Sequence, residues 1–241
     1  NTVTDLYGNE YVGTTITREG EAINSYYGYV ADGYFQSQQE IDDAECVYNG
    51  DKSQIKPGFI RYVDVNNDGV INSNDRVVLG NSTPRYEFGL NLDMAWKGLD
   101  VGLFFQGVGK RDLFYSGAGV RPLVQNSTMY KSRLDTWSED NPDAEYPLLL
   151  VDNGSTNMNN IISSFWVKNG AYVRLKNVTI GYTLPKKLLA KASIERLRFY
   201  VSCQNLFTIS EGYKGYDPES GAGTSMYPIM KTFNFGVNLD F

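Results

Sequence analysis

The end of the chain alternates between apolar and polar side chains with a period of two. The apolar positions are Phe233, Phe235, Val237, Leu239 and Phe241, and the positions between them are polar or glycine. Successive side chains of a β-strand point to opposite faces, so this period predicts a strand with one apolar and one polar surface.

The same period recurs in several earlier segments. Residues 84–96, 99–106 and 197–204 alternate in this way, and Lys97-Gly98 between the first two reads as a tight turn. Together 84–96 and the strand that follows it (99–114) predict an antiparallel hairpin. Residues 165–182 are also strand-like, but their alternation slips near Lys176-Asn177, which predicts a β-bulge there.

The connections between these strands alternate in length. Lys97-Gly98 is short and 183–194 is modest, with Pro185 placed to start a helical turn, whereas 115–163 and 208–227 are long and polar. Such alternation is typical of transmembrane barrels, which have short turns on one side and long loops on the other. A soluble β-sandwich also alternates apolar and polar positions, so the pattern leaves both architectures open.

Composition narrows the chemistry that the chain can perform. Among 241 residues, 14% are aromatic and 24 are glycine, which favours strands and turns. The chain has no histidine, which removes Ser-His-Asp catalysis and His-ligated metals. A net charge of −6 argues against nucleic acid as a partner, and Cys46 and Cys203 allow at most one disulfide, expected to be absent.

The N-terminal third is less regular than the rest. Residues 24–37 hold aromatics and glycines that could form one strand, and the sequence starts at Asn1 without a signal-like apolar run. We interpret the chain as a piece of a longer protein. The expected division is a loop region over 1–83 and strands with their loops over 84–241.

One motif carries recognisable chemistry. Residues 64–75 read DVNNDGVINSND, with oxygen side chains at loop positions 1, 3 and 5 and a glycine at position 6. This is the spacing of an EF-hand-type Ca²⁺ loop, with aspartate in place of the usual final glutamate. The expected ligands are Asp64, Asn66, Asp68, the Val70 carbonyl and Asp75. The alternative is an Asx-rich turn that holds no metal.

Other candidate sites are weaker. The carboxylates of 135–145 could form a glycosidase pair, but a solvated acidic loop is the expected interpretation. No catalytic residue is therefore predicted, and the chain is not expected to be an enzyme. No substrate-binding residue can be named either.

Several segments resemble one transporter family. They are GFIRYVDVNNDGVINSNDRVVLGNSTPRYEFG at 58–89, INSYYGYVADGYFQSQQEID at 23–42, AYVRLKNVTIGYTLP at 171–185, SCQNLFT at 202–208 and the last strand. They are similar, in the same order, to the C-terminal region of SusC/RagA-family TonB-linked outer-membrane transporters. The alternative that remains is a secreted, calcium-stabilised β-sandwich that binds carbohydrate.

The resemblance implies an all-β fold: the last five or six strands of an antiparallel transmembrane barrel of about 22 strands with a plugged lumen and long extracellular loops. It implies a location in the outer membrane of a Gram-negative cell, a SusD-like surface lipoprotein as partner, and energy coupling to TonB–ExbB–ExbD through a part of the protein upstream of Asn1. The implied cargo is glycan fragments or peptides. The long loops and the Ca²⁺ loop would be extracellular. The rest of the barrel must come from outside this chain, because five or six strands cannot close a barrel and lipid does not tolerate open edges.

Overall fold

The computed structural model describes residues 13–116, 131–150, 158–190, 193–212, 216–219 and 229–241. The chain divides into two compact units. The first contains Asn1–Ser82, Asp112–Lys168 and Ser220–Met226, and the second contains Thr83–Arg111, Asn169–Glu219 and Tyr227–Phe241. Residues 112–168, which include most of the longest predicted loop, therefore group with the N-terminal residues.

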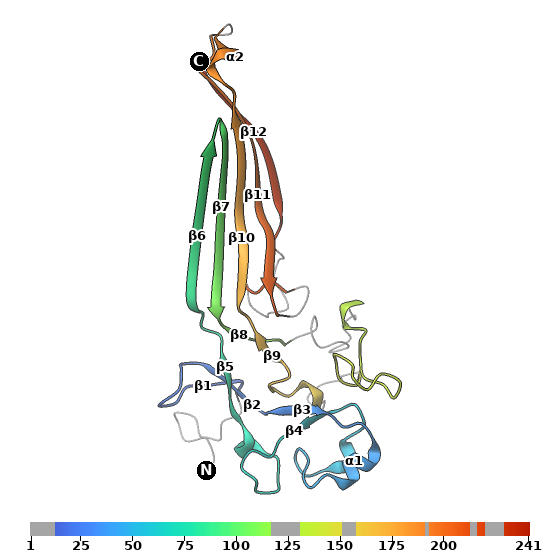
Figure 1. Ribbon diagram of the computed structural model, residues 1–241. Helices are drawn as coiled ribbons and strands as arrows, with labels where there is room; N and C mark the ends of the chain where they lie inside the picture. Colours follow the sequence, from blue (N-terminus) through green and yellow to red (C-terminus); the bar gives the residue numbers. More distant parts are fainter. Residues whose placement is uncertain (1–12, 117–130, 151–157, 191–192, 213–215, 220–228) are drawn as a thin grey trace. The chain divides into compact units, whose positions relative to one another are not determined.

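The second unit is one antiparallel sheet of five long strands in the order β12-β11-β10-β7-β6. Figure 1 shows the strands lying side by side. Their bounds are β6 Arg85–Trp96, β7 Leu99–Lys110, β10 Tyr172–Thr183, β11 Arg196–Ser210 and β12 Thr232–Asp240. The number of long strands agrees with the expected five or six. Each of β6, β7 and β10 has 12 residues, which at about 3.3 Å per residue gives roughly 40 Å.

Short turns join neighbouring strands where the sequence predicts them. Lys97 and Gly98 both have positive φ, 48° and 91°, and join β6 to β7. Two residues with positive φ make the hairpin turn whose twist matches that of the flanking strands. The helical turn expected near Pro185 is α2 (Lys186–Leu189), which follows β10.

The sheet register separates an apolar face from a mainly polar face. The predicted bulge is confirmed, because the pairing of β10 with both neighbours shifts between Leu175 and Asn177. The extra residue keeps the apolar positions before and after it on the same face. Cross-strand rows such as Met94–Val101–Ile180–Val201–Phe235 form that apolar face. The opposite face carries rows such as Asp93–Gly102–Thr179–Ser202–Asn234.

Two predicted strands are shorter than expected. The strand predicted over 99–114 ends as β7 at Lys110, and β8 (Asp112–Phe114) continues it in a separate pair. The strand predicted over 165–182 likewise divides into β9 (Val167–Asn169) and β10. β8 pairs with β9, so the two extensions form their own two-stranded sheet.

The first unit is built from short strands and turns of helix. One sheet has the order β1-β2-β5 (Thr15–Ile16, Ser25–Gly28, Val77–Asn81), and β3 (Ala31–Tyr34) pairs with β4 (Ile60–Tyr62). The helical elements are α1 (Gln38–Asp43), η1 (Lys52–Gln54), η2 (Ser73–Asp75), η3 (Lys131–Arg133) and η4 (Met158–Asn160). Where the sequence allowed a single strand over 24–37, the structure has β2 and β3, each of four residues. A membrane-spanning strand needs about 9–11 residues, so neither is long enough to span.

A compact apolar cluster holds this unit together. Its buried members are Phe35, Ile41, Val47, Ile55 and Phe59. Ile41 is contributed by α1, whose first turn is capped by Ser37: the hydroxyl accepts a hydrogen bond from the Glu40 amide. Cys46, also in this unit, and Cys203, buried on β11, are both free thiols. No helix among the described residues is long and apolar enough to cross a membrane.

Candidate functional site

The apolar face of the five-stranded sheet lies open to its surroundings. Phe233, Phe235 and Val237 on β12 are 58%, 80% and 56% exposed, and every residue of β6 is exposed. A β-sandwich would bury these side chains against a second sheet. Their exposure in a unit that has one sheet among its described residues argues against the sandwich. An exposed apolar surface of this extent indicates an interaction with lipid or with another apolar surface.

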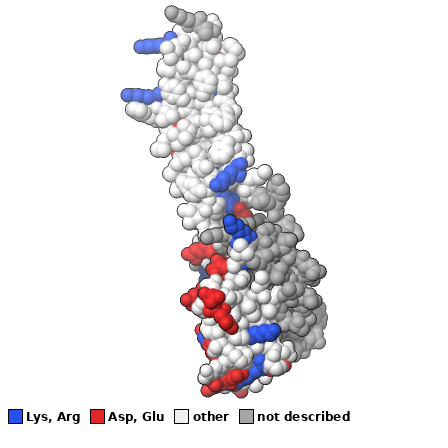
Figure 2. Space-filling model, turned by 90° about the vertical axis from the view of Figure 1, so that its right-hand side faces the viewer, with Lys and Arg blue, Asp and Glu red and all other residues white. Residues whose placement is uncertain are grey.

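Large aromatic side chains mark the hairpin end of this face. Trp96, Leu99 and Tyr182 form one cross-strand row, and Trp96 is 69% exposed. The Lys97 ammonium lies 4.7 Å from the centre of the Trp96 ring. Aromatic and basic residues of this kind are enriched where a barrel meets the membrane–water interface. In Figure 2, the surface of the sheet carries few charged side chains along the middle of the strands.

The polar face is held by a cross-strand ion pair near the same end. Arg198 on β11 reaches across β10 to Asp100 on β7, with its Nε 2.9 Å from the carboxylate. Gly181 of β10 lies beneath the guanidinium and makes room for it, because a Cβ there would come within 2.4–2.6 Å of three guanidinium atoms. The pair therefore depends on a glycine in the strand between its partners.

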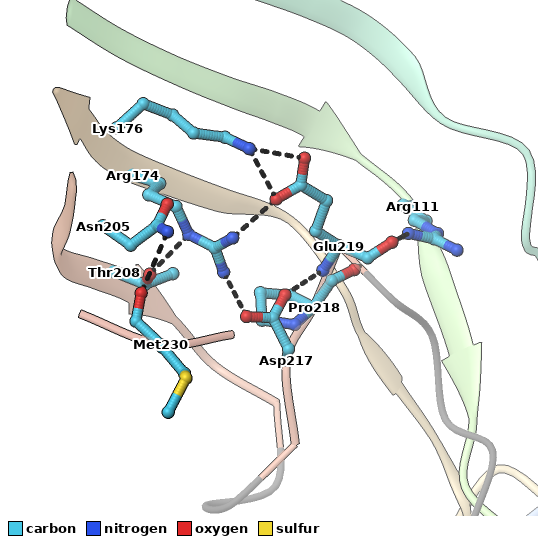
Figure 3. A network of polar contacts seen from close by, with 9 residues as sticks. All are labelled: Arg111, Arg174, Lys176, Asn205, Thr208, Asp217, Pro218, Glu219 and Met230. Atoms are coloured by element: carbon cyan, nitrogen blue, oxygen red, sulfur yellow. Dashed lines mark hydrogen bonds and ion pairs between the residues drawn. The ribbon is translucent and has the colours of Figure 1, made fainter. Parts of the chain in front are cut away.

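A second polar network lies at the other end of the same face. Arg174 of β10 is 1% exposed and binds both Asp217 and Glu219, and Lys176 binds Glu219 as well (Figure 3). These carboxylates belong to the connection between β11 and β12. No motif in the sequence signals this network, because the two cations of β10 and the two carboxylates are more than 40 residues apart and no fixed spacing relates them.

The Ca²⁺-type loop belongs to the first unit, between β4 and β5. Asp64, at the first position, uses one carboxylate oxygen to accept a hydrogen bond from the Gly69 amide at 2.8 Å. Its other oxygen, Oδ1, is fully buried and has no hydrogen-bond partner. Burial of the carboxylate raises its pKa, but hydrogen bonds from backbone amides of the loop outweigh this effect and leave the pKa below its usual value.

Asp75, at the last position of the loop, is completely buried next to the Asp64 carboxylate. Its Oδ1 accepts from the Val65 amide at 2.9 Å, and its Oδ2 accepts from the Asn72 amide at 2.8 Å. With Asn72 it forms a capping box around η2. Ile71 is 1% exposed and bridges to Tyr48, so the loop is fixed to the interior of the unit.

The remaining oxygens of the loop are engaged locally. Asp68 accepts from the Val70 amide at 2.9 Å and from the Asn66 side chain at 3.0 Å. In the part of the chain that the structure describes, no three Asp, Glu, Cys or His side chains already converge as metal ligands. The loop thus partly fits Ca²⁺: Asp64 offers a buried oxygen with no partner, whereas Asp68 would have to turn toward a metal.

The acidic loop at 135–145, which could have formed a glycosidase pair, has a structural role. Asp135 accepts hydrogen bonds from the Asn141 side chain at 2.7 Å and from the Glu145 amide at 3.2 Å. Its carboxylate is therefore used to close the turn between two β-bridges, Thr136–Tyr146 and Ser138–Asn141.

Comparisons with known proteins identify a single class of relatives. TonB-dependent receptor P3 of Formosa agariphila is 35% identical over 95% of this chain. TonB-dependent receptor SusC of Bacteroides thetaiotaomicron is 28% identical over 89% of it. No protein-family profile matches the chain.

Solved structures agree with these relatives on the fold. A structure of the RagAB peptide transporter superposes on 90% of this chain with a TM-score of 0.63 and 24% identity. The RagAB peptide importer in its open-open state covers the whole chain with a TM-score of 0.62. The sheet is therefore a portion of an antiparallel β-barrel.

The chain spans about a quarter of the length of the proteins it matches. It covers 23% of receptor P3, 20% of SusC and 23% of the RagAB chain. Its 241 residues thus correspond to a segment of that architecture.

Proposed function

Because this chain is a homologue of SusC/RagA-type TonB-dependent outer-membrane receptors, we propose that it forms one segment of a transporter that imports nutrients across the outer membrane. The observation that carries the proposal is the two-faced sheet. Its apolar face, about 40 Å long, is exposed as a lipid-facing barrel wall would be, and its polar face carries the ion pairs and amides of a lumen wall. The location is the outer membrane.

The partners follow from the relatives and belong to the proposal. SusC and RagAB are the relatives from which we infer a SusD-like surface lipoprotein and coupling to TonB. We propose glycan fragments or peptides as cargo and assign no catalytic role. Uptake of labelled oligosaccharides and labelled peptides by cells that express the complete receptor would separate the two cargo classes.

The orientation of the sheet can be tested in the full-length protein reconstituted in lipid. Spin labels attached at Phe235→Cys and Asn234→Cys occupy neighbouring positions on opposite faces. We expect the label at 235 to be more accessible to oxygen, which partitions into lipid, and the label at 234 to be more accessible to a water-soluble nickel complex. Equal accessibility at the two positions, or the reverse order, would contradict a membrane-spanning sheet.

We further propose that residues 64–75 bind one structural Ca²⁺ through Asp64, Asn66, Asp68, the Val70 carbonyl and Asp75. The spacing and the buried, partnerless Oδ1 of Asp64 support this proposal. None of the ion pairs among the described residues involves Asp64, Asp68 or Asp75, so a bound cation would supply the opposite charge that these carboxylates lack. The shorter aspartate at the last position favours a modest affinity.

Terbium luminescence of the purified full-length receptor tests this site. Tb³⁺ takes the place of Ca²⁺ and is sensitised by nearby tyrosines, such as Tyr48 across the bridge from Ile71. We expect a signal that Ca²⁺ displaces and that Asp64→Asn weakens by at least about tenfold. Asp51→Asn is the matched control, because Asp51 caps η1 in the same unit. A signal unchanged by Asp64→Asn would leave the Asx-turn interpretation in its place.

A further inference from the structure

A short acidic segment from the β11–β12 connection lies on the polar face of the sheet. Asp217 and Glu219 approach β10 from the side opposite the apolar face, and Arg174 lies between them (Figure 3). The Arg174 side chain is 1% exposed, whereas the Asp100 side chain on the same face is 37% exposed. The segment is what covers it.

Arg174 uses each nitrogen of its guanidinium group. Nη2 lies 2.5 Å from Asp217, Nη1 lies 2.5 Å from Glu219, and Nε donates to the Thr208 hydroxyl at 2.8 Å. Charge-assisted hydrogen bonds in a fixed fork are among the strongest polar contacts in proteins. Thr208 lies directly opposite Arg174 on β11, so the guanidinium is oriented by the sheet before it meets the segment.

Further contacts fix the segment at its backbone. Arg111, just beyond the end of β7, donates to the carbonyls of Pro218 at 2.8 Å and Glu219 at 3.3 Å. Inside the segment, the Asp217 side chain accepts from the Glu219 amide at 2.8 Å, which closes a small turn. Lys176 reaches both oxygens of Glu219, at 2.9 and 3.0 Å.

The bulge in β10 explains how the cations gather. Lys176 is the extra residue between Leu175 and Asn177, and it lies on the same side of the sheet as Arg174. Two cations of β10 therefore meet two carboxylates, and Arg111, which follows β7, binds the backbone carbonyls of the same segment. The sheet thus forms a binding site for carboxylates, and the carboxylates that bind there belong to a segment of the same chain.

We propose that Arg174 latches residues 217–219 onto the wall of the barrel lumen, so that these three residues line the import path instead of standing free at its rim. This placement rests on the proposed function, which assigns the polar face to the lumen. The contacts that form the latch belong to one compact unit and do not depend on that assignment.

Hydrogen–deuterium exchange of the full-length receptor in detergent tests the latch. In Arg174→Met we expect peptides containing residues 216–219 to exchange at least about tenfold faster, because two charge-assisted contacts are lost. The matched control is Arg198→Met, which breaks the other ion pair on the same face and should leave these peptides unchanged.

A second variant controls for the possibility that Arg174→Met disturbs the sheet itself. Asp217→Asn with Glu219→Gln keeps the size of both side chains and leaves β10 intact, and it should release the segment to a similar extent. Unchanged exchange of 216–219 in both variants would overturn the latch, as would an equal loss of protection in β10 and β11. Neither result bears on the spin-label test of the membrane orientation, so the two proposals fail separately.

Discussion

At the scale of single residues, the polar face depends on glycines over which larger side chains lie flat. Tyr200 lies over Gly236, where a Cβ would come within 2.3 Å of its ring, and Arg198 lies over Gly181. Arg198 also stacks on Tyr200, with 5.1 Å between the guanidinium carbon and the ring centre. The missing Cβ atoms of Gly181 and Gly236 thus permit a chain of contacts from Asp100 on β7, across β10 and β11, to β12.

Gly181→Ala should therefore cost stability through Arg198. The added methyl displaces the guanidinium from Asp100, and we expect a loss of about 1 kcal/mol. Gly102→Ala is the control, since its nearest neighbour would be a single Asp93 oxygen at 3.1 Å. Urea unfolding of the full-length protein in lipid vesicles measures both.

The double mutant sharpens this test. In an Arg198→Ala background the alanine at 181 has nothing to displace, so its cost should disappear. A cost that persists in that background would show that the methyl itself strains the strand.

The candidate site was only partly predictable at this scale. Asp64, Asp68 and Asp75 follow a spacing that the chemistry of one ion imposes, so their grouping could be inferred from the sequence. The sequence could not show that Asp64 Oδ1 is buried without a hydrogen-bond partner, because this depends on how the loop closes. Arg174 and Asp217 are brought together by sheet register and by the return of a distant connection, and neither leaves a local pattern.

At the scale of elements, the hairpin turn between β6 and β7 sets the register of one edge of the sheet. Gly98 has φ of 91°, and a Cβ there would lie 2.6 Å from the Thr183 carbonyl oxygen. Gly98→Val should destabilise the fold by about 1–3 kcal/mol, because it combines an unfavourable φ with a clash against backbone.

Lys97→Asn should act in the opposite direction. Asparagine tolerates positive φ, and Asn-Gly is a preferred pair in two-residue hairpins, so we expect a gain of a few tenths of a kcal/mol. The measurement is the urea midpoint of each variant in lipid vesicles. A stabilising Gly98→Val would contradict the turn geometry.

A charge placed on the lipid-facing side of β12 should be costly. Phe235→Lys puts an ammonium near the middle of the strand on the apolar face, at an expected cost of about 2–4 kcal/mol near the bilayer midplane. Asn234→Lys, one residue away on the polar face, should change stability by less than about 1 kcal/mol. Equal costs at the two positions would be incompatible with a lipid boundary.

The long strands were predictable because one physical rule governs every residue in them. A sheet with one apolar and one polar face forces a period of two, and β6, β7, β11 and β12 keep it with few exceptions, such as Phe104 on the polar face of β7. The period of two shows which face of the sheet a residue occupies, but it does not show where a strand ends. Alternation continues through Leu113 and Phe165, so the pattern predicts β8 as part of β7 and β9 as part of β10, although β8 and β9 pair with each other.

At the scale of the whole molecule, the first unit is the part whose structure the sequence patterns do not predict. Its strands have two to five residues, too short for a period to be measured. Its stability comes from a cluster formed by side chains of several loops, including Phe35, Ile41 and Phe59. Contacts of this kind depend on long-range folding, and composition alone predicted no more than a polar, aromatic-rich region.

In the membrane, the five-stranded sheet must pair with further strands. Among the described residues, β6 and β12 each pair on one side, so each carries a row of backbone groups on its outer edge. An unsatisfied backbone group in lipid costs several kcal/mol, and closure of a barrel removes such edges. We therefore expect this chain, expressed alone and transferred into detergent micelles, to form no heat-modifiable band on a gel, whereas the full-length receptor does. Co-expression with the remaining part of the receptor should restore the band, since the missing strands would then cover β6 and β12. A compact, heat-modifiable species formed by the chain alone would mean that the sheet closes its edges on itself or on a second copy, and the segment interpretation would be wrong.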